Sequence, residues 1–147
     1  MTEQELEEKI KEKFLSILRK LAKFIVEDLT KNASPQFRYL ISGCMEAMER
    51  YNLSFDMNGE QRETYNNLFA QIGSRCRINP KYNNNGIVYN TPYINNMNQL
   101  EKIYSAFEKI DNFLSALEQT KKFMTIIHEV SPIFNDIGVN QNYVDEV

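Results

Sequence analysis

The clearest periodic pattern of apolar positions lies in the first 30 residues. Apolar side chains recur there at steps of three and four, which places them on one face of a helix. These positions are Leu6, Ile10, Phe14, Ile17, Leu18, Leu21, Ile25 and Leu29. Thr2 followed by Glu5 matches a capping box at the start of this helix. Leu15 and Val26 widen the apolar arc, so we expect neighbours to pack on two sides of it.

A second helix is predicted after Ser34 and Pro35, which suit the N-cap and the first helical position. Its apolar positions also follow helical spacing. They are Phe37, Leu40, Ile41, Cys44, Met45, Met48 and Tyr51. Because only about four residues join the two helices, we expect residues 3–52 to form an antiparallel helical hairpin. Gly43 costs about 1 kcal/mol inside a helix relative to Ala, which close approach of a partner helix would explain.

Two further helices are predicted in the rest of the chain. A short one covers residues 60–72, with Tyr65, Leu68, Phe69 and Ile72 inward and Gly73 as its C-cap. A long fourth helix runs from about Met97 to Glu129, on a heptad-like seam that suits a near-antiparallel neighbour. His128 then stands at its C-terminal end, where a cation suits the helix dipole. Ser131 and Pro132 end this helix, and a short last helix closes at Gly138.

Residues 74–96 differ from the helical segments in composition. They hold an Asn-Asn-Asn-Gly turn signal at 83–86, followed by Ile87, Val88 and Tyr89, which have strand character. The segment is therefore either a small β-hairpin, pairing residues 75–78 with 87–90, or an irregular Asn-rich loop. A connection of this length without regular structure is commonly functional or mobile.

Together these elements predict a mainly all-α fold. The expected architecture is a single helical domain over residues 1–138, with a hairpin, a long fourth helix and an insertion at about 74–96. An acidic tail at 139–147 is expected to be loosely ordered. The 147 residues include two Cys, which fits a reducing compartment, and no apolar run reaches the roughly 20 residues needed to span a bilayer. The acidic N-terminus lacks the basic region of a signal peptide, so we expect a cytoplasmic protein.

Most catalytic and cofactor-binding motifs are absent from the sequence. A single histidine excludes metal sites built on His pairs, and neither a Rossmann nor a P-loop glycine motif occurs. We therefore expect no metal, no cofactor and no catalytic residue, and predict that the protein is not an enzyme. One enzymatic alternative remains: Cys76, between two arginines, could have a depressed pKa and act as a nucleophile. Cys44 lies on the apolar face and is expected in the core.

The candidate ligand site is the basic part of the Asn-rich segment. Residues 72–96 carry three bases and no acid, in a chain whose net charge is −3. The bases are Arg75, Arg77 and Lys81. They could neutralise a phosphate, while Tyr82, Tyr89 or Tyr93 stacks on a base, as Tyr65 in the preceding helix also could. Alternatively, the arginines pair with acids elsewhere and the tyrosine rings cover the core.

Residues 21–52 resemble the helical hairpin domain of phage anti-defence sponges, which sequester cyclic nucleotide messengers. The similar features are a first helix ending in Ile-Val-Glu-Asp, a Ser-Pro turn, and Met-Glu-Ala-Met before Asn52. Hairpins of that family are richer in Ala in the second helix, where this chain has Tyr39, Met45, Met48 and Tyr51. The resemblance implies an oligomer that binds ligand between subunits without turning it over. It assigns no ligand-contacting residue to this sequence.

The predicted function is therefore non-catalytic. We expect the protein to capture a nucleotide-like signalling molecule, as a phage anti-defence protein acting in the host cytoplasm would. The alternative is a protein–protein inhibitor or scaffold that acts on a host protein through helical surfaces, including the wide face of the first helix. We expect a homo-oligomer, and neither duplex nucleic acid nor membrane as a partner, because the sequence pI is about 5.3 and the first helix is charge-balanced.

Overall fold

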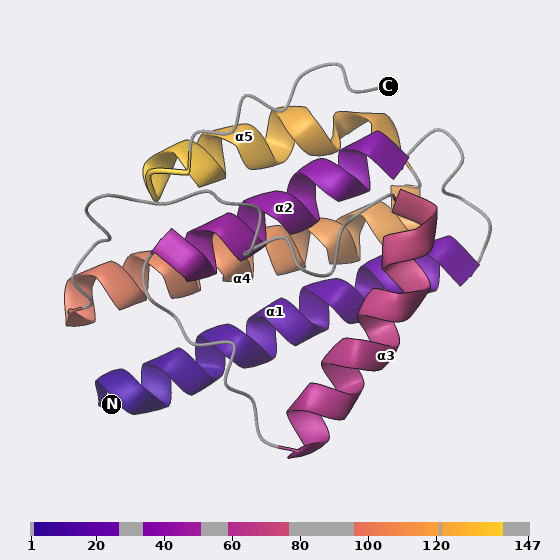
Figure 1. The fold of residues 1–147 in the computed structure, drawn as a ribbon. Coiled ribbons are helices and arrows are strands. Elements are labelled where there is room, and N and C mark those ends of the chain that lie inside the picture. The colour runs from indigo at the N-terminus through magenta and orange to yellow at the C-terminus, as the bar shows by residue number, and fades with distance from the viewer. Residues whose placement is uncertain (1, 27–33, 51–58, 77–95, 121, 140–147) are drawn as a thin grey trace.

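The computed structural model describes residues 2–26, 34–50, 59–76, 96–120 and 122–139. Within these ranges the chain is almost entirely helical and contains no strand, which confirms the predicted all-α class. The helices are α1 (Glu3–Val26), α2 (Ser34–Arg50), α3 (Gly59–Cys76), α4 (Met97–Thr120) and α5 (Ile126–Asp136), with a 3-10 turn, η2 (Phe123–Thr125), before α5. They pack as a small bundle in which α3 crosses the others at a steep angle (Figure 1).

Helix α1 is the central element of the bundle. It packs most extensively against α4 and then against α3, so its wide apolar arc is covered on two sides as predicted. Leu15, at the edge of the arc, is as fully buried as the residues on its centre line. At the start of α1, the Glu5 amide donates to the Thr2 hydroxyl oxygen over 3.1 Å, which confirms the predicted N-terminal cap.

Helices α1 and α2 run in opposite directions, as a hairpin requires, but they are splayed apart (Figure 1). Helix α2 packs more extensively against α5 and α3 than against α1. Contact with α1 includes the stacked rings of Phe24 and Phe37, whose centroids are 5.9 Å apart. Phe123 of η2 meets both rings edge-on, at 5.1 and 5.6 Å. The hairpin is therefore held by an aromatic cluster to which a third, distant segment contributes.

The predicted close approach at Gly43 is confirmed, although the approaching helix is α5 and not α1. A Cβ added to Gly43 would lie 2.4 Å from two ring carbons of Phe134. The Phe134 ring also packs edge-on against Tyr39, with centroids 5.8 Å apart. The Tyr39 hydroxyl and the Ser131 hydroxyl share a hydrogen bond of 2.7 Å. Because Gly43 has no side chain, the backbone of α2 can pack directly against the Phe134 ring.

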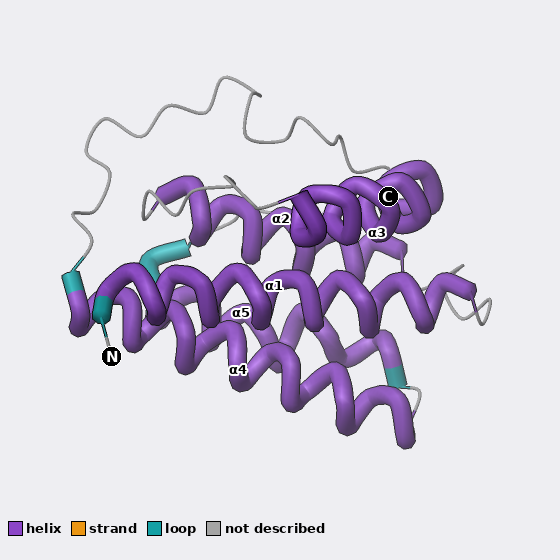
Figure 2. The backbone as a smooth tube through the Cα atoms, turned by 90° about the horizontal axis from the view of Figure 1, so that it is seen from below, coloured by secondary structure: helices purple, strands orange, loops and turns teal. Residues whose placement is uncertain are grey.

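The predicted single helix from Met97 to Glu129 is wrong. Helix α4 ends at Thr120, and the chain passes through η2 into α5, which folds back antiparallel to α4 (Figures 1 and 2). The physical reason is a run of five polar residues, 118–122, which offers no apolar side chain to the seam after Leu117. Breaking there lets Phe123 enter the aromatic cluster. Helix α5 supplies the antiparallel neighbour predicted for the seam, whereas α1 runs parallel to α4.

Two consequences of this break also differ from the sequence expectation. His128 lies exposed in the first turn of α5 and not at a helix C-terminus. Pro132 lies inside α5 and does not end the preceding helix. Proline there leaves the His128 carbonyl without its usual amide partner, and the exposed side of a short helix tolerates this because water can replace the bond.

Helix α3 is longer than predicted. Its inward residues Tyr65 and Ile72 are buried, as expected, but the helix continues through Gly73 to Cys76. Gly73 is therefore not its C-cap, and residues 75 and 76 are helical, which rules out their pairing in a β-hairpin. The remainder of the predicted insertion, residues 77–95, lies outside the described residues, as do residues 140–147 of the predicted tail. Val139, assigned to that tail, is buried in the bundle.

Candidate functional site

The predicted ligand-binding residues are not brought together by the described part of the structure. Arg75 lies in the last turn of α3, and its side chain is not among those described. The other five, Arg77, Lys81, Tyr82, Tyr89 and Tyr93, lie outside the described residues. Tyr65 is buried against Phe14, with ring centroids 6.2 Å apart, and is therefore a core residue that cannot stack on a ligand. The basic site stays a prediction.

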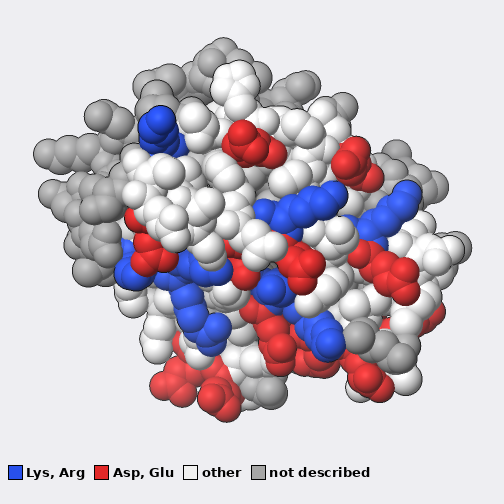
Figure 3. Space-filling model, turned by 180° about the vertical axis from the view of Figure 1, so that it is seen from behind, with Lys and Arg blue, Asp and Glu red and all other residues white. Residues whose placement is uncertain are grey.

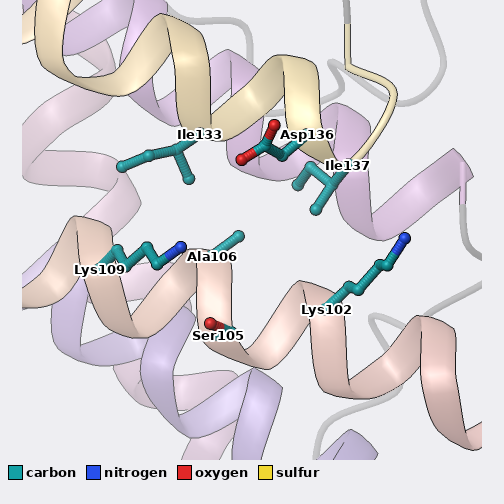
Figure 4. A pocket seen from close by; sticks show the side chains of 7 residues that line it. All are labelled: Lys102, Ser105, Ala106, Lys109, Ile133, Asp136 and Ile137. Atoms are coloured by element: carbon teal, nitrogen blue, oxygen red, sulfur yellow. The ribbon is translucent and has the colours of Figure 1, made fainter.

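A hollow between α4 and α5 has the composition of a small ligand site. We call it the α4–α5 pocket. Its volume is about 270 Å³, and it is lined by Lys102, Ser105, Ala106, Lys109, Ile133, Asp136 and Ile137. In Figure 4, Ile133, Asp136 and Ile137 reach across from α5 and its C-terminal end toward α4, while Lys109 and Lys102 stand at opposite ends of the gap. This volume lies just below the usual range of roughly 300–1,000 Å³ for small-molecule sites.

The local sequence explains the floor of the pocket. Lys102, Ser105 and Lys109 follow one another at steps of three and four, so they share one face of α4. Ala106, beside them, is buried next to the seam, and its small side chain leaves space where the seam positions themselves carry Leu, Ile or Phe. Lysine stems can lie along the apolar wall while their ammonium groups reach solvent. The arrangement offers apolar contact in the middle and positive charge at both ends.

The opposite wall is fixed by the way α5 ends. The Val139 amide donates to the Phe134 carbonyl over 2.9 Å, and the Gly138 amide donates to the Asn135 carbonyl over 3.1 Å. These two bonds form a Schellman motif, and Gly138 adopts the required left-handed conformation with φ of 75°. The predicted closure of the last helix at Gly138 is thus confirmed. Burial of Val139 anchors the motif and holds Asp136 and Ile137 over the pocket.

The charges of the pocket have no partners among the described residues. Lys102, Lys109 and Asp136 are exposed, and none of them takes part in an ion pair or side-chain hydrogen bond with the described part of the chain. For the two lysines the reason is visible in the sequence. The residues three and four positions away on α4 are Asn, Gln, Ser, Ala and Phe, so no carboxylate lies within intrahelical reach.

A second charged cluster contrasts with this pocket because its charged groups are paired with one another. Asp111 of α4 is buried, and its Oδ1 accepts from Lys20 Nζ over 2.7 Å and from Ser16 Oγ over 2.9 Å. Lys13 Nζ lies 3.5 Å from Asp111 Oδ2. The Asp111 backbone carbonyl accepts a further bond of 3.2 Å from Ser115 Oγ. This cluster joins α1 to α4, and we assign it a structural role.

The hollow between α1 and α3 is larger, at about 420 Å³, but less suited to one ligand chemistry. It is lined by Glu12, Leu15, Arg19, Glu60, Gln61 and Thr64. Two carboxylates and one guanidinium share this small space, with a single aliphatic side chain. Ligand sites are usually mostly apolar with a few polar groups, so the α4–α5 pocket is the better candidate.

Among the residues that the structure describes, four titratable groups have shifted pKa values, and none of the four lines the α4–α5 pocket. Burial raises the pKa of the Cys44 thiol far above its ordinary value, which confirms Cys44 as an inert core residue. Burial also raises the pKa of Tyr65. A hydrogen bond from Lys11 lowers the pKa of Glu8. Lys23, bonded to Glu118, lowers the pKa of that exposed carboxyl. The shifts therefore mark core packing and surface ion pairs.

Two features of the sequence pointed to the α4–α5 pocket, but the basic, Asn-rich composition of residues 74–96 favoured a site in that segment instead. Two lysines seven residues apart, with no acid three or four positions away, mark a helix face without internal ion pairs. Ala106, beside a seam of bulky side chains, marks a place where space remains. The sequence did not show that α5 returns antiparallel to α4. A single helix from Met97 to Glu129 would place Asp136 far from Lys109.

Charges of both signs alternate over the face opposite to that of Figure 1, and the coloured residues form no continuous basic stripe (Figure 3). Among the described residues, no group of three His, Cys, Asp or Glu side chains is arranged to hold a metal ion. No described helix combines the length and the apolar character needed to cross a bilayer.

Comparison with protein-family models, curated proteins and solved structures finds no significant match to this chain.

Proposed function

We propose that the protein is a non-catalytic binding protein that captures a small, nucleotide-like anion in the α4–α5 pocket. One observation carries the proposal: two lysines without acidic partners in the described structure flank an apolar wall of Ile133 and Ile137. Ammonium groups attract phosphate, and an apolar wall receives the face of a planar base. The hollow of about 270 Å³ is small and open to solvent on one side, so we expect it to hold one nucleotide unit.

Two features of the sequence support the same class of ligand. The basic segment with Arg75, Arg77 and Lys81 gives the chain a second group of cations without neighbouring acids. Residues 21–52 resemble hairpins of phage anti-defence sponges, which hold nucleotide messengers without turning them over. Capture of a signalling nucleotide in the host cytoplasm, by an oligomer of this chain, is the biological role that we propose.

The alternative of a protein–protein inhibitor or scaffold has less support. The apolar face of α1, which the sequence offered as a docking surface, faces α4 and α3 inside the bundle. A partner protein would therefore have to use another helical surface.

Calorimetric titration of the 147-residue chain with GMP and AMP at low salt tests the proposal. We expect both to bind, and chromatography to recover both unchanged. The double variant Lys102→Ala/Lys109→Ala should weaken binding by up to about 5-fold, since the phosphate reaches one of the two lysines and one exposed charge contact contributes roughly 0.2–1 kcal/mol. Circular dichroism should show unchanged helicity, because both side chains are exposed.

The matched control is Lys9→Ala/Lys122→Ala, which removes the same charge from exposed positions outside the pocket. It should bind like the unmodified protein. Arg75→Ala/Arg77→Ala tests the predicted basic segment in the same assay. Loss of binding only in the arginine variant would place the ligand there and contradict our assignment of the pocket. Absence of nucleotide binding, or hydrolysis of the nucleotide, would contradict the proposed function itself.

A further inference from the structure

We infer that the α4–α5 pocket selects guanine nucleotides, and that Asp136 reads the guanine base. This inference rests on the proposed function and makes it specific. It starts from Asp136, the one acidic side chain among the described residues that line the pocket; its carboxylate lies along the edge of α5 that borders the gap (Figure 4).

Asp136 stands where an acid is unfavourable for the fold. It is the last residue of α5, and the C-terminal end of a helix carries partial negative charge. Asp111, Glu8 and Glu118 form ion pairs with lysines, whereas Asp136 has no ion pair or hydrogen bond with the described residues. The carboxylate therefore contributes no described contact that stabilises the bundle. A group that opposes the helix dipole while facing a pocket is suited to receive a ligand.

The chemistry of a carboxylate restricts what that ligand can be. An ionised carboxylate only accepts hydrogen bonds, and its two oxygens can accept two parallel ones. The guanine base presents such a pair, its N1–H and its exocyclic N2 amino group, on one edge. Adenine presents a single amino group beside a ring nitrogen that is itself an acceptor, and this nitrogen would face the second carboxylate oxygen. Guanine is thus the base that uses both oxygens of Asp136.

The rest of the pocket fits the remainder of a guanine nucleotide. Ile133 and Ile137 flank Asp136 on the same wall and offer aliphatic contact to the base. Lys102 and Lys109 are seven residues apart, which is about 10 Å along α4, and they stand at the two ends of the gap. A base bound at Asp136 lies between the two lysines, so the phosphate of the same nucleotide reaches one of them. The pocket has room for a single nucleotide unit.

The test compares GMP with IMP, which differs only by lacking the N2 amino group. The unmodified protein should bind GMP about 10-fold more tightly than IMP, as expected for loss of one hydrogen bond to a charged acceptor in an open pocket. In Asp136→Asn the order should reverse. The amide oxygen still accepts from N1–H, but the amide NH₂ now opposes the N2 amino group of GMP and no group of IMP.

Stability measurements separate this role from a structural one. Asp136→Asn should unfold at the same or a higher temperature than the unmodified protein, because it removes a negative charge from a helix C-terminus. Glu129→Gln, an exposed acid in the first turn of the same helix, is the charge-matched control. It should leave the ratio of GMP to IMP affinity unchanged.

The possible results separate guanine selection, the role of Asp136 and nucleotide capture from one another. Equal binding of GMP, AMP and IMP would overturn guanine selection while leaving nucleotide capture intact. A preference for GMP that persists in Asp136→Asn would overturn the assignment of the reading group. If no nucleotide binds, the proposed function falls and guanine selection falls with it. Reversal of the GMP and IMP order in Asp136→Asn, with the fold unchanged, supports the inference.

Discussion

Replacing Gly43 by Ala tests the packing of α2 on α5, the contact that places α5 over the pocket. The new Cβ would lie 2.4 Å from two carbons of the Phe134 ring and 2.9 Å from a third, and all three distances are shorter than ordinary van der Waals contact. The ring cannot move aside cheaply because it is buried and packs against Tyr39, which is itself hydrogen-bonded to Ser131.

Overpacking of this kind costs about 1–3 kcal/mol, and the higher helix propensity of Ala returns just under 1 kcal/mol. We therefore expect Gly43→Ala to lower the free energy of unfolding by about 1–2 kcal/mol, since the clash is severe. For a chain of this length the midpoint of thermal unfolding should fall by about 3–8 °C. Urea denaturation followed by circular dichroism measures the free energy directly.

Gly59→Ala is the matched control, because a Cβ at Gly59 meets nothing within 4 Å. It should change stability by less than about 0.5 kcal/mol. A double variant that adds Phe134→Leu should recover part of the loss at Gly43, since the shorter side chain removes the clash and the two effects are coupled. If Gly43→Ala is as stable as the unmodified protein, α5 does not pack on α2 as described.

Two further predictions concern charged groups of the bundle. Asp111→Ala should destabilise the protein by about 1–3 kcal/mol, because Ser16 and Lys20 lose a buried acceptor; equal urea midpoints for variant and unmodified protein would contradict the α1–α4 cluster. The folded pKa values of Glu8 and Glu118 lie below their unfolded values, so the stabilisation from these carboxylates is present above about pH 4.3 and is lost as the pH falls through the folded pKa. Urea midpoints measured between pH 6 and pH 3 should therefore depend less on pH in Lys11→Met/Lys23→Met, and an unchanged acid dependence would count against these pairs.

The fold was predictable where apolar spacing is regular. The stripes on α1, α2 and α4 fixed the helical faces, and their described members are buried in the core. The break after Thr120 was missed because Met124 and His128 extend the seam by their spacing, although the run of polar residues before Phe123 gives the seam no buried side chain. Periodicity records which face is apolar. It does not show where ending a helix and reversing the chain gives more stabilising contacts than continuing the helix.

The partners of each helix were harder to predict than the helices themselves. The short link between α1 and α2 favoured their mutual packing, yet α2 uses Gly43 and Tyr39 against α5. A glycine in a helix signals close approach without naming the partner. The candidate pocket was missed for the same reason, since Asp136 and Lys109 face the same hollow only after α5 returns along α4.

The most direct test of the central claim is an NMR titration of the ¹⁵N-labelled chain with GMP. We predict that the largest amide shifts occur in residues 102–109 of α4 and 133–138 at the end of α5, and that residues 12–19 of α1 shift little. Largest shifts in residues 75–93, or along the hollow between α1 and α3, would show that the ligand binds elsewhere. An unchanged spectrum at saturating GMP would contradict the account as a whole.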